Sequence, residues 1–223
     1  MIRMIVFDMA GTTVDEDNMV YKTLQKAIND NGFQFSLDQV LAQGAGKEKL
    51  QAIKSILLLS EVNDDQLSND IYQHFIILLN EAYQYLDVKP QQHTAELFQI
   101  LRDRNILVLL NTGYNTETAL SLIEKLGWEK GKDYDGLVTA SDVTNNRPNP
   151  DMILLAMKKF GIENPKEVVK VGDSAIDIQE GQNAGCLLNI GITTGAHTHA
   201  QLQTAKPDYI INDLLDLIPI ISP

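Results

Sequence analysis

From Pro90 onward, short apolar runs alternate along the chain with segments whose apolar residues recur at the spacing of helices. The runs are short and rich in Val, Ile and Leu, which predicts buried strands. Such alternation is typical of a parallel sheet with helices on both faces. The predicted strands are 106–111, 136–140, 168–171, 187–190 and 209–211. The predicted helices are 95–103, 116–126, 150–160 and 176–184, followed by a closing helix.

The segment before this region divides into a strand and a helical insertion. Residues 2–7 form another short apolar run and predict a first buried strand. Between residues 18 and 86 the apolar residues fall at helical spacing, with no strand candidate. We therefore expect an α/β fold with a Rossmann-like, three-layer core at residues 1–15 and 88–223. A small all-helical cap, residues 16–87, is inserted after the first strand.

The position of this insertion suggests a role. Ligands of open α/β sheets bind at the carboxyl ends of the strands, and an insertion that directly follows the first strand lies over that edge. It is therefore interpreted as a lid over a site. The alternative is a second domain unrelated to the site.

Composition excludes several function classes. The formal net charge of −12 argues against a nucleic-acid partner, since phosphate backbones are held by clustered Lys and Arg. No apolar segment reaches the roughly 18 residues that a membrane span needs. The single cysteine, Cys186, cannot form an intrachain disulfide. We expect a cytoplasmic protein, monomer or homodimer, whose partner is a small molecule.

Polar residues follow the predicted strands at four places. Each has an ordinary alternative: an aspartate that stabilises a turn, a helix N-cap, a solvated arginine or an exposed acid. Because the carboxyl ends of parallel strands meet at one edge, their recurrence there favours a shared site. The four places are Asp8, Thr112 with Gly113, Arg147, and Asp173 with Asp177.

The residue types at these places suit an anionic ligand and a metal ion. The hydroxyl of Thr112 and the N–H groups beside Gly113, at the start of a helix, can bind an anion. A guanidinium such as Arg147 can hold two phosphoryl oxygens. Carboxylates four residues apart, as at Asp173 and Asp177, suit a hard cation that prefers oxygen ligands.

The segments Asp8-Met9-Ala10-Gly11-Thr12, Thr112-Gly113, Arg147-Pro148 and Gly172-Asp173 with Asp177 resemble the four motifs of the haloacid dehalogenase superfamily. The resemblance implies that Asp8 attacks phosphorus and becomes a phospho-aspartate. It further implies that Mg²⁺ is held by Asp8, the backbone carbonyl of Ala10 and Asp173, with Asp177 behind them. Thr112, Gly113 and Arg147 would bind the phosphoryl group.

At the position of Ala10, most phosphatases of this superfamily have a second aspartate, which protonates the leaving group. Phosphonoacetaldehyde hydrolases share the alanine and use a cap lysine that forms an imine with the substrate. The segment 43–47 resembles the lysine segment of that family, which makes Lys47 the candidate. Gln43 and Leu50 differ from it, standing where the family has methionine and histidine.

The sequence thus predicts a Mg²⁺-dependent, phosphonatase-like hydrolase of a small phosphorylated or phosphonate metabolite. One alternative is a phosphomonoesterase of the phosphoglycolate or sugar-phosphate type, or a phosphomutase, in which Lys47 only binds substrate. A further alternative, which rests on Ala10, is a binding protein without catalytic activity.

Overall fold

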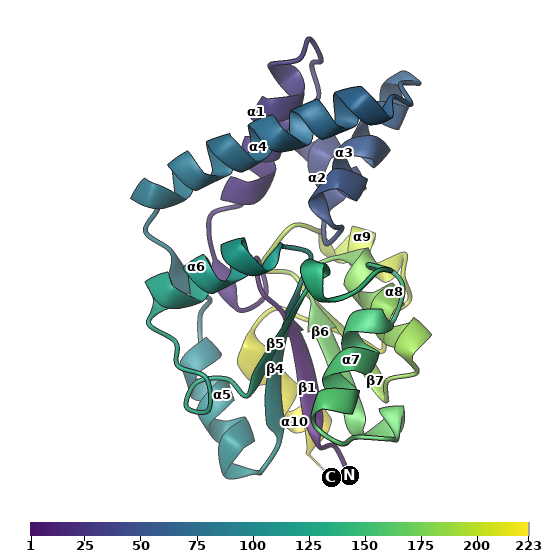
Figure 1. The fold of residues 1–223 in the computed structure, drawn as a ribbon. Coiled ribbons are helices and arrows are strands. Elements are labelled where there is room, and N and C mark those ends of the chain that lie inside the picture. The colour runs from purple at the N-terminus through teal and green to yellow at the C-terminus, as the bar shows by residue number, and fades with distance from the viewer. Residues whose placement is uncertain (223) are drawn as a thin grey trace.

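The computed structural model of the protein describes residues 1–222. Its main sheet has six parallel strands in the order β5-β4-β1-β6-β7-β8, so the first strand lies inside the sheet (Figure 1). The parallel sheet predicted from the sequence is confirmed. The strands are β1 Met4–Asp8, β4 Leu107–Thr112, β5 Gly136–Thr139, β6 Val168–Gly172, β7 Leu188–Ile192 and β8 Tyr209–Ile211.

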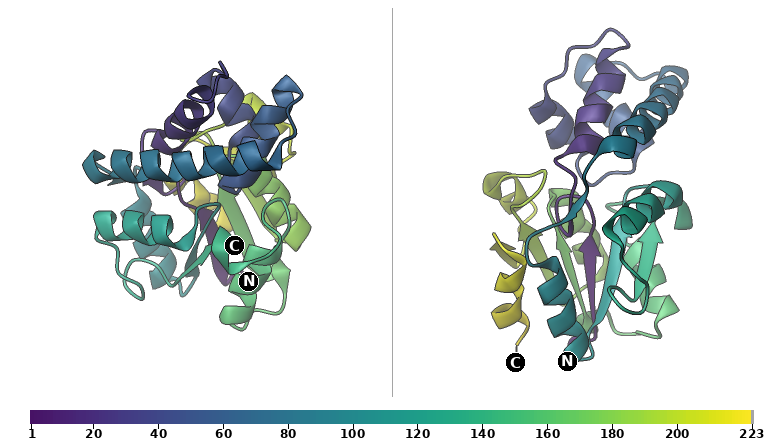
Figure 2. Two further views of the ribbon diagram at one scale, coloured as in Figure 1. Left: turned by 45° about the horizontal axis from the view of Figure 1, so that its top comes forward. Right: turned by 90° about the vertical axis from the view of Figure 1, so that its left-hand side faces the viewer.

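Helices cover both faces of this sheet, which explains why its strands read as continuous apolar runs. In β1, Met4 and Val6 join the hydrophobic cluster of α7, whereas Ile5 and Phe7 join that of α5 and α10. The three layers are visible in Figure 2 (right). The α/β fold class is therefore confirmed. The helices of this part are α5 Thr94–Asp103, α6 Thr116–Leu126, α7 Asp151–Lys159, α8 Ala175–Ala184, α9 His199–Gln203 and α10 Leu217–Ile221.

Four helices, inserted between β1 and α5, pack on one another above the carboxyl edge of the sheet (Figure 1). The longest buries one stripe of apolar residues at a spacing of four, as its sequence predicts. At the start of α2 the Ser36 hydroxyl accepts from the Gln39 N–H, and the Gln39 side chain accepts from the Ser36 N–H, a capping box. The helices are α1 Met19–Asn29, α2 Leu37–Gly44, α3 Lys49–Leu57 and α4 Asp65–Tyr85.

A short antiparallel ribbon joins the two parts. It pairs β2, Val14–Asp15, with β3, Lys89–Pro90, so the chain enters and leaves the four helices at neighbouring points. The sequence analysis missed this ribbon and helix α9, because elements of two to five residues carry no measurable periodicity. The expected cap, residues 16–87, lies between the two ribbon strands, and the division into domains at these limits stays a prediction.

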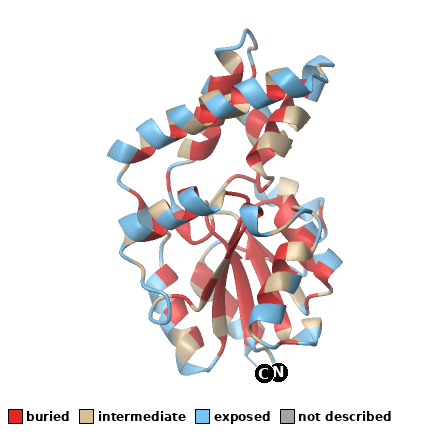
Figure 3. Cartoon of the chain, viewed as in Figure 1, coloured by how far each residue is buried: buried red, intermediate tan, exposed pale blue. Residues whose placement is uncertain are grey.

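Burial follows the layers of the fold. The strands of the main sheet are buried along most of their length, and the helices expose their outer faces (Figure 3). Within residues 1–222, no helix combines the length and the apolar character needed to cross a membrane.

The packing of α4 generates a stability prediction. Phe75 is fully buried in the helical insertion, whereas Ile77, on the same helix, is 58% exposed. We expect Phe75→Ala to lower the free energy of unfolding by about 3–5 kcal/mol through the cavity it leaves. Ile77→Ala should change it by less than about 0.5 kcal/mol. Urea unfolding of both variants checks this, and equal effects would contradict the packing described.

Candidate active site

The sequence-predicted acids meet at the carboxyl edge of the sheet. Asp8 is the last residue of β1 and pairs in register with Asn111 of β4, while Asp173 directly follows the neighbouring β6. Asp177 lies in the first turn of α8. Each of the three aspartates offers an oxygen, and these oxygens lie within 4.8 Å of one another. All three side chains are buried, so the fold brings this predicted group together.

Arg147 joins them from the loop before α7 and is only 1% exposed, not a solvated arginine. Its Nη1 donates to Asp8 Oδ1 at 2.7 Å and lies 3.0 Å from Asp177 Oδ1. Its Nε donates to Glu180 Oε2 at 2.9 Å, and its Nη2 donates to the Asn111 carbonyl oxygen at 3.0 Å. Burial alone would lower the pKa of Arg147, but these acids raise it well above its ordinary value. The guanidinium is thus a fixed cation.

The sequence analysis missed Lys170 and Glu180. Lys170 is fully buried in β6, and its Nζ lies 3.0 Å from Asp177 Oδ1 and 3.3 Å from Glu180 Oε2. Asn111 Nδ2 also donates to Glu180 Oε1 at 2.9 Å. A lysine inside the apolar run Val168–Val171 is a signal that could have been used, because a lysine is almost never fully buried without a charged partner.

The buried charges at this edge do not balance. Of the cations in residues 1–222, only Arg147 and Lys170 form ion pairs with the four carboxylates here, which leaves two negative charges without a paired cation. Burial raises the pKa of Asp8, with the charge of Asp177 adding to it, and raises the pKa of Asp173 further, with Asp8 adding to it. Uncompensated buried charge is costly, so a divalent cation with oxygen ligands fits this group. The carboxylates are those of Asp8, Asp173, Asp177 and Glu180, and the cations are Arg147 and Lys170.

Asp173 and Asp177 are held differently. Asp173 Oδ2 accepts the Ala196 N–H at 2.6 Å, and its carboxylate passes so close to Gly11 and Gly195 that a side chain at either glycine would collide with it. The Asp177 carboxylate accepts from Ser174 Oγ. Burial alone would raise the pKa of Asp177, but the nearby cations keep it below its ordinary value. Asp177 thus stays ionised and supports the group from behind.

The anion-binding candidates lie at the end of β4. Thr112 is buried, and its Oγ1 accepts the Tyr114 N–H at 3.2 Å. A Cβ on Gly113 would lie 2.7 Å from the Lys47 carbonyl oxygen, so only a glycine lets the insertion approach this loop. The Gly46 carbonyl oxygen in turn lies 3.3 Å from Arg147 Nη1. The helical insertion therefore covers the group of acids directly.

The arrangement can be compared with known proteins. The model of the haloacid dehalogenase-like hydrolases matches residues 2–185 of the chain. The chain belongs to this hydrolase family. The resemblance inferred from the four motifs is confirmed, and the chain is an enzyme of the haloacid-dehalogenase type.

Two curated relatives and one solved structure illustrate the similarity of this hydrolase. It is 29% identical to phosphonoacetaldehyde hydrolase from Latilactobacillus sakei, over 99% of this chain and 95% of the relative. It is 26% identical to pyrophosphatase PpaX from Oceanobacillus iheyensis, over 99% and 97%. A phosphonoacetaldehyde hydrolase-like protein from Oleispira antarctica superposes with a TM-score of 0.85 at 21% identity, covering 99% of this chain and 91% of that one.

Ala10 and Lys47 are the two residues that suggested a phosphonate reaction. Ala10 lies two residues after Asp8, in the turn that returns to Val14, and its methyl group cannot transfer a proton. The Lys47 Nζ donates to Ser55 Oγ of α3 at 2.9 Å. Among residues 1–222 it has no hydrogen bond or ion pair with Asp8, Thr112 or Arg147. The structure therefore does not bring the Lys47 ammonium together with the acids.

Lys49 is instead the buried lysine of the insertion. It is 6% exposed, and its Nζ donates to the Lys47 carbonyl oxygen at 3.1 Å. The same atom lies 5.1 Å from the ring centroids of Tyr21 and Tyr114. This could not be predicted, because two lysines that lie two residues apart, before and at the start of α3, cannot be ranked without knowing which way each side chain points.

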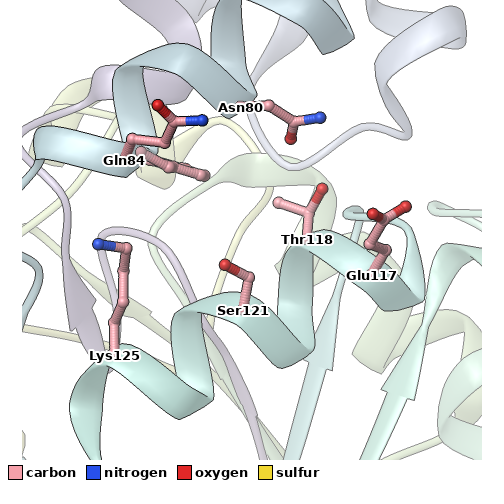
Figure 4. Close-up of a pocket in the computed structure, with 7 residues that line it drawn as sticks. Asn80, Gln84, Glu117, Thr118, Ser121 and Lys125 are labelled. Carbon is pink, nitrogen blue, oxygen red and sulfur yellow. The ribbon is translucent and has the colours of Figure 1, made fainter.

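Tyr114 belongs to a buried chain of hydrogen bonds. Its hydroxyl lies 3.0 Å from that of Tyr83, and Tyr83 in turn donates to Glu16 Oε2 at 3.0 Å. Tyr83 also borders a cleft of about 240 Å³ between α4 and α6 (Figure 4). This cleft marks the outer seam between the insertion and the core. It is lined by Asn80, Tyr83 and Gln84 of α4 and by Glu117, Thr118, Ser121 and Lys125 of α6.

Glu16 generates a pH-dependent stability prediction. Burial raises its pKa to about 7, whereas an unfolded chain titrates glutamate near about 4.3. Between these values the folded protein holds a proton that the unfolded chain has lost, so stability falls as the pH rises. Glu16→Gln removes this titration. Over that pH range, the free energy of unfolding of the variant should therefore decline by about 3 kcal/mol less than that of the wild-type protein.

Urea unfolding between pH 4.5 and 7.5 measures this difference. Exposed Glu163→Gln is the matched control and should keep the wild-type slope. Identical slopes for all three proteins would show that Glu16 does not titrate as described.

Proposed function

We propose that this hydrolase is Mg²⁺-dependent and cleaves a small phosphorylated or phosphonate metabolite through a phospho-aspartate on Asp8. The observation that carries the proposal is the buried group of Asp8, Asp173 and Asp177 around Arg147, with two negative charges left without a paired cation. A nucleophilic carboxylate, a fixed guanidinium and a set of oxygens that could hold a divalent cation are the parts that phosphoryl transfer requires.

In this proposal each residue has a defined task. Asp8, Asp173 and the backbone carbonyl of Ala10 hold Mg²⁺, and Asp177 keeps the group oriented through Arg147. When bound, the ion supplies positive charge that offsets the charge of the phosphoryl oxygens. Thr112, Gly113 and Arg147 bind those oxygens and align phosphorus with the Asp8 carboxylate.

The Arg147 guanidinium must stay in place through the reaction. Its Nε is held by Glu180 and its Nη2 by the Asn111 carbonyl oxygen, so its orientation does not depend on substrate. A preorganised cation of this kind needs no rearrangement when negative charge moves from Asp8 to the phosphoryl group.

The proposal has two alternatives for the bond that breaks, phosphorus–carbon in a phosphonate or phosphorus–oxygen in a phosphate ester. Ala10 and the names of relatives such as phosphonoacetaldehyde hydrolase favour a phosphonate substrate. The contact of Lys47 with Ser55 favours a phosphate ester, because an imine-forming lysine must reach the substrate. We therefore keep phosphomonoesterase activity as the second candidate. A cytoplasmic location and a monomeric or homodimeric state remain predictions.

The first experiment tests phosphoryl transfer itself. Wild-type enzyme is assayed for phosphate release on phosphoglycolate, sugar phosphates, p-nitrophenyl phosphate and phosphonoacetaldehyde, with Mg²⁺ and with EDTA. We expect Mg²⁺-dependent turnover that Asp8→Asn reduces by about 10³-fold or more. Asp103→Asn, an exposed control on α5, should retain full activity. A folded Asp8→Asn variant as active as wild type would refute the proposal.

The second experiment distinguishes the two kinds of bond. An imine between a lysine and phosphonoacetaldehyde is trapped irreversibly by borohydride, and peptide mapping then identifies the labelled residue. Since Lys47 Nζ is bound to Ser55 Oγ, we expect no label at Lys47 and turnover of phosphate esters instead. Labelled Lys47 together with loss of activity would establish the phosphonate reaction.

A further inference from the structure

Ala10 leaves the proposed reaction without an acid for the leaving group, and a buried lysine of the insertion is a candidate for that role. Lys49 enters from α3 and is buried beneath the insertion. Within residues 1–222, the ammonium donates one hydrogen bond, to a backbone carbonyl, and forms no ion pair. A buried ammonium has three donors, so this one retains donors for a ligand.

The surroundings of Lys49 connect it to the loop at the end of β4. The Lys47 carbonyl oxygen that accepts from its Nζ packs against Gly113, where an added Cβ would lie 2.7 Å from that oxygen. Burial lowers its pKa, and among its charged neighbours Asp8 opposes that shift most strongly. The rings of Tyr21 and Tyr114 flank the ammonium on two sides at equal distances. A desolvated lysine releases its proton more readily than a solvated one, as a proton donor to a leaving group must.

These flanking rings are themselves fixed. The Tyr21 hydroxyl accepts the Gly46 N–H at 2.9 Å, which ties it to the loop that touches Arg147. Tyr114 is tied through Tyr83 to Glu16. The ammonium is therefore positioned by contacts from both the insertion and the core, as a group that acts in a defined direction must be.

We propose that Lys49, rather than Lys47, protonates the leaving group and later deprotonates the attacking water, an inference that rests on the function proposed above. The leaving group it serves is a small organic group whose leaving oxygen lies beside the Lys49 ammonium.

The proton balance closes over two steps. As the Asp8 carboxylate oxygen bonds to phosphorus, the bond from phosphorus to the leaving oxygen breaks, and that oxygen keeps the electron pair and takes a proton from the Lys49 ammonium. In the second step water attacks phosphorus, and the bond to Asp8 breaks with its electron pair returning to the carboxylate. The proton of that water returns to the Lys49 amine, so ester and water give alcohol and phosphate.

The test uses aryl phosphates that differ in the basicity of the departing phenolate, from p-nitrophenyl to p-methoxyphenyl phosphate. A proton donor matters most for basic leaving groups. We therefore expect Lys49→Met to lose about 10²–10⁴-fold in kcat on the most basic leaving group and far less on p-nitrophenyl phosphate. Lys49→Arg keeps the charge but cannot release a proton. Its kcat should likewise fall more steeply than that of wild type as the basicity of the leaving group rises.

Lys54→Met is the matched control, on the same helix with an ammonium that pairs with Asp65 at the surface, and it should keep the wild-type dependence on leaving-group basicity. An unchanged dependence in a folded Lys49→Arg or Lys49→Met variant, or a steepened one in Lys54→Met, overturns the assignment. If Asp8→Asn still abolishes turnover, only the Lys49 inference fails. If wild-type enzyme with Mg²⁺ releases phosphate neither from this series nor from phosphoglycolate, sugar phosphates or phosphonoacetaldehyde, the proposed function fails with it.

Discussion

Strands, helices and the insertion of this hydrolase all contact one buried guanidinium. Arg147 contacts the end of β1 through Asp8, the end of β4 through Asn111, α8 through Asp177 and Glu180, and the insertion through Gly46. An arginine can do this because its fork of donors is planar and always charged. Removing it would leave several buried acids unpaired, which is far more costly than the loss of one surface ion pair.

The same edge shows a local conflict between stability and function. Burying four carboxylates with two cations opposes folding, and three of those carboxylates face one another. Apolar residues would pack there at lower cost. Conflicts of this kind are expected where a site is built, because binding of a cation or substrate recovers the lost free energy.

Much of the fold was predictable because strands buried on both faces and amphipathic helices leave strong periodic signals. The predicted helix at 116–126 and strand at 209–211 match α6 and β8 in full. Asp8, Thr112 and Asp173 could be placed together from strand order alone. Lys170 could have been added, because it interrupts a buried apolar run, whereas Glu180 and Lys49 could not, because charge alone does not reveal burial. The directions of Lys47 and Lys49 depend on side-chain packing that no spacing encodes.

The narrow ribbon of β2 and β3 has a consequence for selectivity. Entry and exit through two adjacent strands is the geometry of a hinge. Any tilt that separated the insertion from the sheet would hydrate Lys49 and Glu16, whose charged forms water favours. Enclosing a ligand would then cost the free energy of burying these groups again. Only a ligand with enough contacts to the insertion would offset that cost, so selectivity would arise from enclosure.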